Sequence, residues 1–516
     1  MSLPLEASAE APALSSNAAQ IDWALAVVAM AIGGWIRWSG FHRQSLWVDE
    51  MSSYGLALQP LHRIMPNILA VDAHPPLYIF LVHIAHFTFH LGIVGSVRAP
   101  SFLAGTLTIA IVYALMRVLV GRGAAVVAAA LAVLTPMLVW YSREGRMYAL
   151  TWMFVMLTLL ALALAARSGK WRWLVAYAVC LGASLYADIS AIMALVPQAV
   201  LIVAFLLRSQ GEARRRWLRA GAAYLVGWAL FIPWLLNLHS QILRTHGTFS
   251  DYPATSGTAL RLLLNFTGVE ATYALLYRLT VPAVLAGLML AICALGIVGA
   301  IWLSRRHRLY MATVLTLTLG TAAMCLLLVA AGSPSVLLPR VMGLTVFGII
   351  LALAGTAELG WHAARKLPIG RAAVGAGVAI ALLTSAVSLR TVEAHGYNGQ
   401  NWRSVAAVIL ARAQPGDAVI DYPYGLKWMV DAYIPVGSFW TYNAFGIWQS
   451  SHPVAESWFR HLAEGHTHVF FVFYAADGID APYYDRWFQS LGYQRVSGDP
   501  TAGYGVLEYV VRAVPG

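Results

Sequence analysis

Apolar runs of about twenty residues recur along nearly the whole chain, and they constrain its fold more than any other feature. A helix of that length crosses roughly 30 Å of hydrocarbon. Hydrophobic residues make up 59% of the 516 residues and charged residues only 11%, which is more apolar surface than a water-soluble core buries. The sequence therefore predicts a polytopic α-helical membrane protein.

Basic residues between these runs predict the topology, because cytoplasmic loops are enriched in lysine and arginine. They also account for the net charge of +11 without nucleic-acid binding. If all five basic clusters are cytoplasmic, an even number of spans separates neighbouring clusters. About eleven spans satisfy this parity, with the N-terminus inside and the tail after residue 390 outside. The clusters lie at 117–122, 167–172, 208–219, 305–308 and 365–371, and the spans at 21–40, 97–117, 123–140, 147–166, 171–187, 189–207, 218–238, 281–303, 309–331, 339–360 and 370–389.

The N-terminus and the cysteines agree with this interpretation. The first span is predicted to be retained, because no lysine or arginine precedes it and no small-residue cleavage site follows it. Cys180, Cys293 and Cys325 all lie in apolar runs, which predicts buried free thiols and no disulfide or metal framework.

One apolar segment, residues 76–93, would break the parity if it crossed the membrane. It is short, begins after two prolines and carries His83, His86 and His90 on one predicted helical face. It is predicted to form an amphipathic helix at the outer interface. The alternative is an ordinary span whose histidines are hydrogen-bonded.

The predicted topology divides the chain into a transmembrane domain, 1–391, and a small extracytoplasmic α/β domain, 392–516. Four loops of the first domain face outward, at 41–96, 141–146, 239–280 and 332–338, and the third is long enough to act as a lid. The second domain combines helical patterns at 401–413 and 425–434 with strand patterns at 418–422, 468–474 and 504–511.

Two adjacent carboxylates, Asp49 and Glu50, follow the first span in "SLWVDEMSSYG". Neighbouring side chains do not point in one direction, so they are not interpreted as an acid/base pair. Asp49 is assigned the chemistry and Glu50 a structural role. The alternative, which position alone favours, is that Asp49 caps a helix beginning at Met51.

Further ionisable residues gather at the outer ends of other spans. His74 lies in "DAHPPLY", Arg143, Glu144 and Arg146 in "WYSREGRMYAL", and Arg340 in "SVLLPRVMG". Each has an ordinary explanation, since arginines anchor spans at the interface and a histidine can precede a turn. Together they predict a functional site, because ionisable groups at this depth are usually functional. The cationic side chains could bind a phosphate, and a carboxylate near them could act as a general base.

An ordered set of short motifs resembles a known family. The motifs are "WVDE", "HPPLY", "VRAPSFLAG", "YSREGRMYAL", "LPR" and "NWRSVAAVILARAQPGDAVI", and they extend over most of the chain. The chain resembles the GT-C-type integral membrane glycosyltransferases, in the group of protein O-mannosyltransferases and lipid A aminoarabinose transferases.

The resemblance implies an inverting transfer of a sugar from a polyprenyl-phosphate donor. Asp49 would accept the proton of the acceptor, and His74 and Arg340 would bind the donor phosphate. Glu50, Tyr78, Arg143, Glu144, Arg146 and Tyr148 would line or support the pocket. The chain departs from the family twice: His74 replaces the lysine of the aminoarabinose branch, and Asp188 in "YADIS" replaces a histidine common among relatives.

Other function classes fit less well. A transporter or flippase of a lipid-linked saccharide would carry charges near mid-span, whereas this chain gathers them at one face. A scaffold would not explain the outward carboxylates and arginines, and a two-carboxylate glycosidase would need partners from different loops. No spacing of histidines and cysteines requires a metal, although a divalent metal stays open. The expected partners are a polyprenyl-phosphate sugar, membrane lipids and a glycan, lipid or protein acceptor, in a bacterial cytoplasmic membrane.

Overall fold

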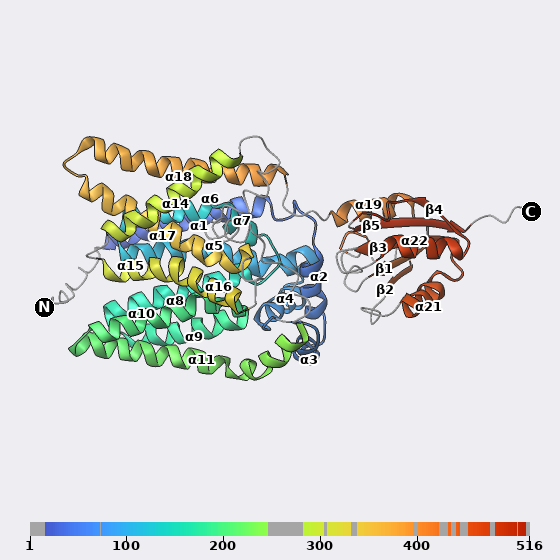
Figure 1. The fold of residues 1–516 in the computed structure, drawn as a ribbon, viewed down its shortest axis with the longest axis horizontal. Coiled ribbons are helices and arrows are strands. Elements are labelled where there is room, and N and C mark those ends of the chain that lie inside the picture. The colour runs from blue at the N-terminus through green and yellow to red at the C-terminus, as the bar shows by residue number, and fades with distance from the viewer. Residues whose placement is uncertain are drawn as a thin grey trace, which may run out of the picture. The chain divides into compact units, whose positions relative to one another are not determined.

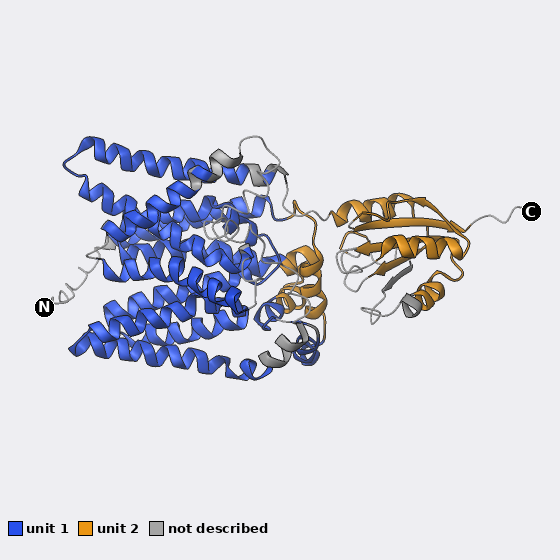
Figure 2. Ribbon diagram, in the orientation of Figure 1, with its two compact units in different colours: residues 1–41, 60–81, 98–397 blue, residues 42–59, 82–97, 398–516 orange. Residues whose placement is uncertain are grey.

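The computed structural model describes residues 16–72, 74–245, 282–303, 307–331, 338–395, 401–422, 432–434, 440–443, 452–474, 480–502 and 504–511. The chain forms two compact units, coloured separately in Figure 2. Unit 1 contains residues 1–41, 60–81 and 98–397, and unit 2 contains residues 42–59, 82–97 and 398–516. The predicted loops 239–280 and 332–338 lie largely outside the described residues, as does most of the predicted helix 425–434.

Unit 1 is a bundle of long helices packed side by side (Figure 1). A helix or a broken helix lies at every range where the sequence predicts a span. Together with α3, which lies outside the predicted spans, the helices of unit 1 are α1 (Ser16–Ser39), α3 (Leu61–Val71), most of α5 (Ile93–Leu119), α6 (Arg122–Leu134), α7 (Pro136–Tyr141), α8 (Tyr148–Ser168), α9 (Trp171–Ala187), α10 (Ile192–Arg208), α11 (Gly211–Thr245), α14 (Pro282–Leu303), α15 (Arg308–Leu315), α16 (Thr321–Ala330), α17 (Pro339–Ala363) and α18 (Pro368–His395).

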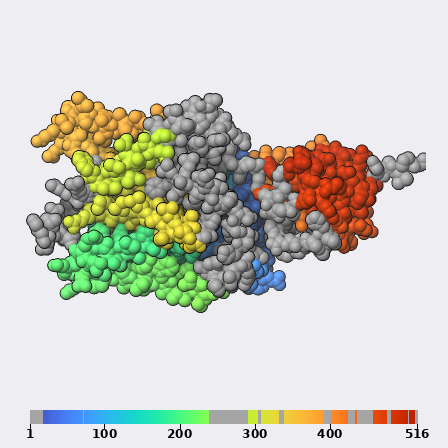
Figure 3. All heavy atoms as spheres, viewed as in Figure 1, coloured from blue at the N-terminus to red at the C-terminus, as the bar shows by residue number. Residues whose placement is uncertain are grey.

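Eight helices of the described residues are long and apolar enough to cross a membrane. This differs from the predicted eleven, partly because predicted spans are interrupted: 123–140 breaks at Thr135, where Pro136 cannot continue helix α6. Large apolar side chains are exposed on the outer helices, including Leu225 and Leu236 on α11 and Leu327 on α16. Atoms of both helices form part of the face shown in Figure 3. Exposed leucines in such numbers suit a bundle surrounded by lipid.

Helices α8 and α17 form the interior of the bundle. In the most apolar 18-residue stretch of each helix, 72% of the residues of α8 and 78% of those of α17 are buried, whereas only 22% are buried in α18. Gly343 allows this contact, because a Cβ there would lie 2.0 Å from Cζ2 of the buried Trp152 ring. Since Gly343 lies one turn into α17, the contact aligns the first turn of α17 with the first turn of α8.

Gly343→Ala should therefore lower the melting temperature of the detergent-solubilised protein. Overpacking of this kind costs about 1–3 kcal/mol, because a buried indole ring has little room to move. Gly375→Ala on α18 is the matched control: nothing lies within 4 Å of its Cβ position. It should leave the melting temperature unchanged or slightly higher, as alanine favours helix over glycine. Equal melting temperatures for both variants would contradict the close packing of α8 and α17.

The segment 76–93 contains helix α4, Leu77–Phe87. At 11 residues it is about half as long as a spanning helix, which agrees with the prediction that it does not cross. The prediction of three histidines on one helical face is wrong for His90, which follows the helix and has a positive φ of 51°. In unit 2, Nδ1 of His83 lies 2.7 Å from the Ala57 carbonyl and Nδ1 of His86 lies 3.4 Å from the Tyr54 hydroxyl.

Unit 2 contains a mixed five-stranded sheet of order β2-β1-β3-β5-β4. The strands are β1 (Ala418–Tyr422), β2 (Trp440–Asn443), β3 (His468–Tyr474), β4 (Tyr493–Ser497) and β5 (Tyr504–Val511), and the helices are α2 (Val48–Ala57), α19 (Trp402–Arg412), α21 (His452–Ala463) and α22 (Ala481–Ser490). β1, β2 and β3 are parallel, and β4 and β5 are antiparallel. Alternate strand residues such as Ile420 and Phe471 form a core with Phe459 of α21 and Phe488 of α22.

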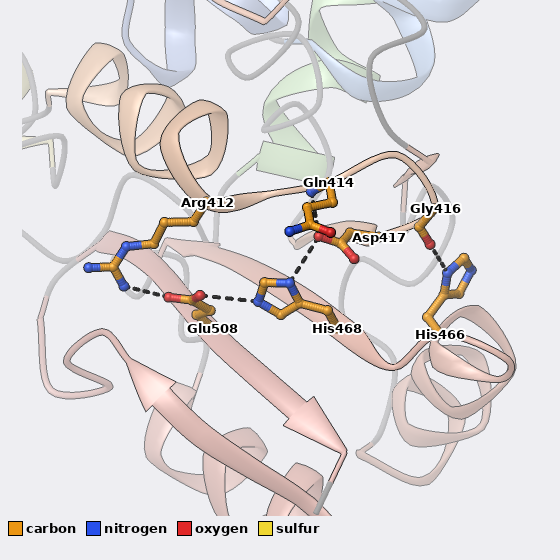
Figure 4. A network of polar contacts seen from close by, with 7 residues as sticks. All are labelled: Arg412, Gln414, Gly416, Asp417, His466, His468 and Glu508. Atoms are coloured by element: carbon orange, nitrogen blue, oxygen red, sulfur yellow. Dashed lines mark hydrogen bonds and ion pairs between the residues drawn. The ribbon is translucent and has the colours of Figure 1, made fainter.

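A charged network ties this sheet to α19 (Figure 4). The ring nitrogens of His468 lie 2.9 Å from Oδ2 of Asp417 and 3.1 Å from Oε1 of Glu508. Nη1 of Arg412 donates to the other oxygen of Glu508 at 2.5 Å. Both carboxylates are buried, so the network joins the end of α19 and the beginnings of β1 and β3 to the middle of β5.

Candidate active site

The turn between α3 and α4 carries a fixed aspartate–histidine pair. Helix α3 ends at Val71, and the extended Asp72 follows it. Oδ1 of Asp72 accepts from the backbone N–H of His74 at 3.0 Å and lies 2.7 Å from its ring Nδ1. Pro75 and Pro76 come next and keep the chain out of a helix until Leu77. The imidazole of His74 is therefore oriented by a carboxylate two residues earlier.

Asp72 is the site residue that the sequence analysis did not select. Burial raises its pKa, but the charge and hydrogen bonds of His74, with a contribution from Arg146, bring the pKa well below the ordinary value. The surroundings of Asp72 therefore favour its ionised form beside the histidine. Its position inside "DAHPPLY" was visible in the sequence, whereas its contact with the ring depends on the turn.

Arg146 brings a buried cation to this turn. Its side chain is only 4% exposed, and Nη2 lies 3.4 Å from Nδ1 of His74. Its backbone carbonyl accepts from Oγ of Ser101 on α5 at 2.7 Å, and the same Oγ lies 2.9 Å from the hydroxyl of Tyr78. Ser101 and Tyr78 are fully buried, so they support the loop from inside the bundle.

Arg340 lies beside the same loop. It is the second residue of α17, and its guanidinium carbon lies 5.6 Å from the centre of the Tyr148 ring, a cation–π distance. Tyr148 is the first residue of α8 and follows Arg146 by two positions, at most about 7 Å along the chain. Arg146 thus contacts His74, and Arg340 contacts Tyr148, two residues further along the chain, near the outer ends predicted for α8 and α17.

The remaining residues of the second loop have structural contacts. Nε1 of Trp140 donates to Oε2 of Glu144 at 2.9 Å. Arg143 turns to the end of α1, where it donates to the carbonyls of Ile36 and Arg37, and it pairs with Glu393 of α18 at 2.6 Å. Glu144 and Arg143 therefore hold the loop in place.

Asp49 and Glu50 belong to unit 2, where they occupy the first turn of α2. The alternative that Asp49 caps this helix is wrong, because α2 begins at Val48 and Trp47 is its N-cap. Glu50 closes the helix start instead, since its Oε2 accepts from the N–H of Trp47 at 3.2 Å. Glu50 is fully buried and Asp49 is partly exposed, which fits a structural role for the former.

Asp188 has a local role. It ends α9 and precedes a 3₁₀ turn, and Oγ of Ser190 donates to its Oδ2 at 2.5 Å. Among the described residues no group of three or more His, Cys, Asp or Glu side chains is arranged to hold a metal. The expectation that no cofactor is required stays a prediction.

Asp72→Asn should reduce kcat/KM for a lipid-phosphate donor by roughly 10- to 100-fold, the scale of one charge-assisted hydrogen bond worth about 1.5–3 kcal/mol. An amide can replace the hydrogen bond to the ring but removes the negative charge. Asp499→Asn is a matched control, because Asp499 makes a similar local turn with Thr501 on the surface of unit 2. Steady-state kinetics with equal losses in both variants would contradict a role for Asp72 in the site.

The side chains of Arg146, Arg340 and His74 have the chemistry to bind and neutralise an anion. Two arginines and an imidazole offer several N–H donors, and Arg146 acts from a buried position where charges interact strongly. A planar guanidinium beside a phosphate makes two parallel hydrogen bonds. A phosphate at the head of a lipid is the ligand that this chemistry suits best.

Part of the chain matches a known protein family. Residues 73–238, which include His74 and Arg146, match the family described as dolichyl-phosphate-mannose-protein mannosyltransferase. No curated protein sequence matches the chain.

Solved structures extend the likeness to nearly the whole chain. ArnT from Cupriavidus metallidurans in the apo state is 15% identical with a TM-score of 0.57, over 95% of this chain and 98% of that one. The same protein bound to undecaprenyl phosphate is 16% identical with a TM-score of 0.52, over 96% and 98%. AglB from Archaeoglobus fulgidus, in complex with an inhibitory peptide and a dolichol-phosphate, is 16% identical with a TM-score of 0.50, over 95% and 75%. The chain is thus a multi-pass membrane protein with the fold of the GT-C glycosyltransferases.

Proposed function

We propose that the protein is an inverting glycosyltransferase that moves a sugar from a polyprenyl-phosphate donor to an acceptor on the outer face of a bacterial cytoplasmic membrane. The proposal is carried by two contacts near the start of α8: Arg146 lies against His74, and Arg340 lies over the ring of Tyr148. His74 and Arg146 lie in the segment that matches a lipid-phosphate-sugar transferase family. The similar ArnT fold bound to undecaprenyl phosphate supports a donor of the same chemical class.

The reaction is a single displacement at the anomeric carbon. An acceptor hydroxyl attacks this carbon and loses its proton to the carboxylate of Asp49. The bond between the anomeric carbon and the phosphate oxygen breaks, and polyprenyl phosphate leaves with both bonding electrons. Negative charge grows on the departing phosphate, and Arg340, Arg146 and His74 stabilise it. No second carboxylate is needed, since no covalent sugar–enzyme intermediate forms.

The sugar and the acceptor are the open parts of this proposal. A glycolipid, a polysaccharide or a protein would each offer a hydroxyl or amine in the outer compartment. Mass spectrometry of lipids and envelope glycans from a deletion strain should show loss of one sugar from one acceptor class. Restoration by the wild-type gene but not by an Asp49→Asn variant is expected. Identical glycan profiles in deletion and parent strains would contradict the proposal.

A further inference from the structure

The segment that leads into the helix of Asp49 is held by the C-terminal part of its own unit. We call residues 42–47 the entry segment. It has neither helix nor strand, so its backbone groups need hydrogen-bond partners from elsewhere. Yet Leu46 is fully buried and Ser45 is 7% exposed. Two residues of the α/β part of unit 2, Arg403 and Tyr433, supply contacts.

Arg403 reaches the entry segment with both its backbone and its side chain. It is the second residue of α19, and the first N–H groups of a helix have no acceptor within the helix. Its N–H donates to Oγ of Ser45 at 3.3 Å. Its Nη2 donates to the carbonyl of His42 at 2.8 Å. One residue thus holds two points of the segment.

Tyr433 holds the segment next to the start of α2. The N–H of Leu46 donates to the Tyr433 hydroxyl at 2.8 Å, and Oγ of Ser45 lies 3.4 Å from the same oxygen. The guanidinium carbon of Arg403 lies 5.4 Å from the centre of the Tyr433 ring. This cation–π contact means that each side chain supports the other.

The first turn of α2 transmits this restraint to Asp49. Leu46 adjoins Trp47, whose N–H donates to the buried Glu50 at 3.2 Å. Oγ of Ser53 donates to the carbonyl of Asp49 at 3.1 Å and closes the same turn. A shift of the entry segment would therefore shift the beginning of α2, and Asp49 with it.

We propose that Arg403 and Tyr433 are positioning residues that hold Asp49 in place for proton transfer. The inference rests on the proposed function, in which Asp49 is the general base. It gives the α/β domain a part in the reaction. It also assigns a role to Arg403 of the motif "NWRSVAAVIL", which is not among the residues proposed to bind the phosphate. A base displaced by about 1 Å can cost roughly a hundredfold in rate.

Hydrogen exchange tests the contacts without reference to any activity. The measurement is amide exchange of peptides covering residues 42–50 in the full-length wild type, Tyr433→Phe, Arg403→Ala and Arg460→Ala proteins. Tyr433→Phe removes the hydroxyl that accepts from the Leu46 N–H and from Oγ of Ser45, so these peptides should exchange several-fold faster. Arg403→Ala should do the same. Arg460 is an exposed arginine of α21 and serves as the matched control, with exchange like the wild type.

Kinetics tests whether the contacts position Asp49. Tyr433→Phe and Arg403→Ala should each lower kcat roughly tenfold or more and leave KM for the donor nearly unchanged, because the base is misplaced while binding remains. The decisive readout is the same pair of changes made in an Asp49→Asn background. Neither should lower kcat further there, since no base remains to be positioned.

The outcomes separate this inference from the proposed function. Unchanged exchange in Tyr433→Phe would show that the contacts do not hold the segment. Faster exchange with unchanged kcat, or a loss of kcat that persists in the Asp49→Asn background, would also overturn the positioning role. A wild type without transferase activity refutes the proposed function, and the positioning role falls with it, while the exchange experiment still decides whether the contacts exist.

Discussion

Asp49→Asn should lower kcat by roughly a hundredfold or more, the scale expected when a general base is lost. Asparagine has nearly the same shape as aspartate but cannot take the proton of the acceptor. Asp49 is not the cap of α2 and is partly exposed, so the substitution should leave folding intact. Steady-state turnover of purified protein, at saturating donor and acceptor, is the measurement.

Glu50→Gln is the matched control for this change. Its amide oxygen still accepts from the N–H of Trp47, so α2 keeps its first turn and most of the turnover should remain. Melting temperature and donor binding should be close to wild type for Asp49→Asn. Near-normal turnover of folded Asp49→Asn protein would mean that the base is another residue.

Arg340→Ala should reduce kcat and raise KM for the donor, with a combined loss on the order of 2–4 kcal/mol. The loss in kcat follows because the phosphate gains negative charge as the bond to the sugar breaks. His74→Ala should cost less, since Arg146 remains within 3.4 Å of the site of that ring. Arg340→Lys should restore part of the loss, as an ammonium cannot copy two parallel hydrogen bonds.

Arg371→Ala is the matched control for Arg340→Ala. Arg371 lies over Trp361 at 5.4 Å, a cation–π contact like that of Arg340, but it belongs to a predicted cytoplasmic cluster. Its loss should leave both kinetic constants unchanged. If Arg340→Ala behaves like Arg371→Ala in a folded protein, Arg340 is an interfacial anchor and the phosphate binds elsewhere.

The helices were predictable because a membrane imposes one length and one polarity on every span. Interruptions within spans were not predictable from apolarity alone. The π-helical turn at Thr316–Gly320 coincides with close packing, since a Cβ at Gly320 would lie 2.6 Å from Pro197 of α10. Apolarity does not record such contacts between helices.

In the C-terminal sheet, too, only some of the elements were predictable from the sequence. β1, β3 and β5 lie where the sequence predicts strands, because their apolar or alternating residues are distinctive. β2 and β4 were not predicted. β2 has only four residues and β4 is an edge strand whose residues are half-exposed, so neither carries a strong pattern.

The site was predictable in its residues more than in its contacts. His74, Arg146 and Arg340 were identified by their place at the ends of spans; in the structure Arg146 contacts His74 and Arg340 contacts Tyr148. Asp72 was not identified because its contact with His74 depends on a local turn, and Ser101 was not identified because a single buried serine leaves no periodic pattern in the sequence. Arg143 was grouped with Arg146 by sequence proximity, although it contacts the end of α1.

Release of polyprenyl phosphate tests the central claim most directly. The purified protein would be reconstituted with polyprenyl-phosphate-linked sugars and with acceptors extracted from the cell envelope. The lipid products would then be identified by mass spectrometry. The account predicts that wild-type protein releases polyprenyl phosphate and glycosylates the acceptor, whereas Asp49→Asn does neither at a comparable rate. Movement of intact lipid-linked sugar across the bilayer, with no cleavage of the sugar–phosphate bond, would contradict it and indicate a flippase.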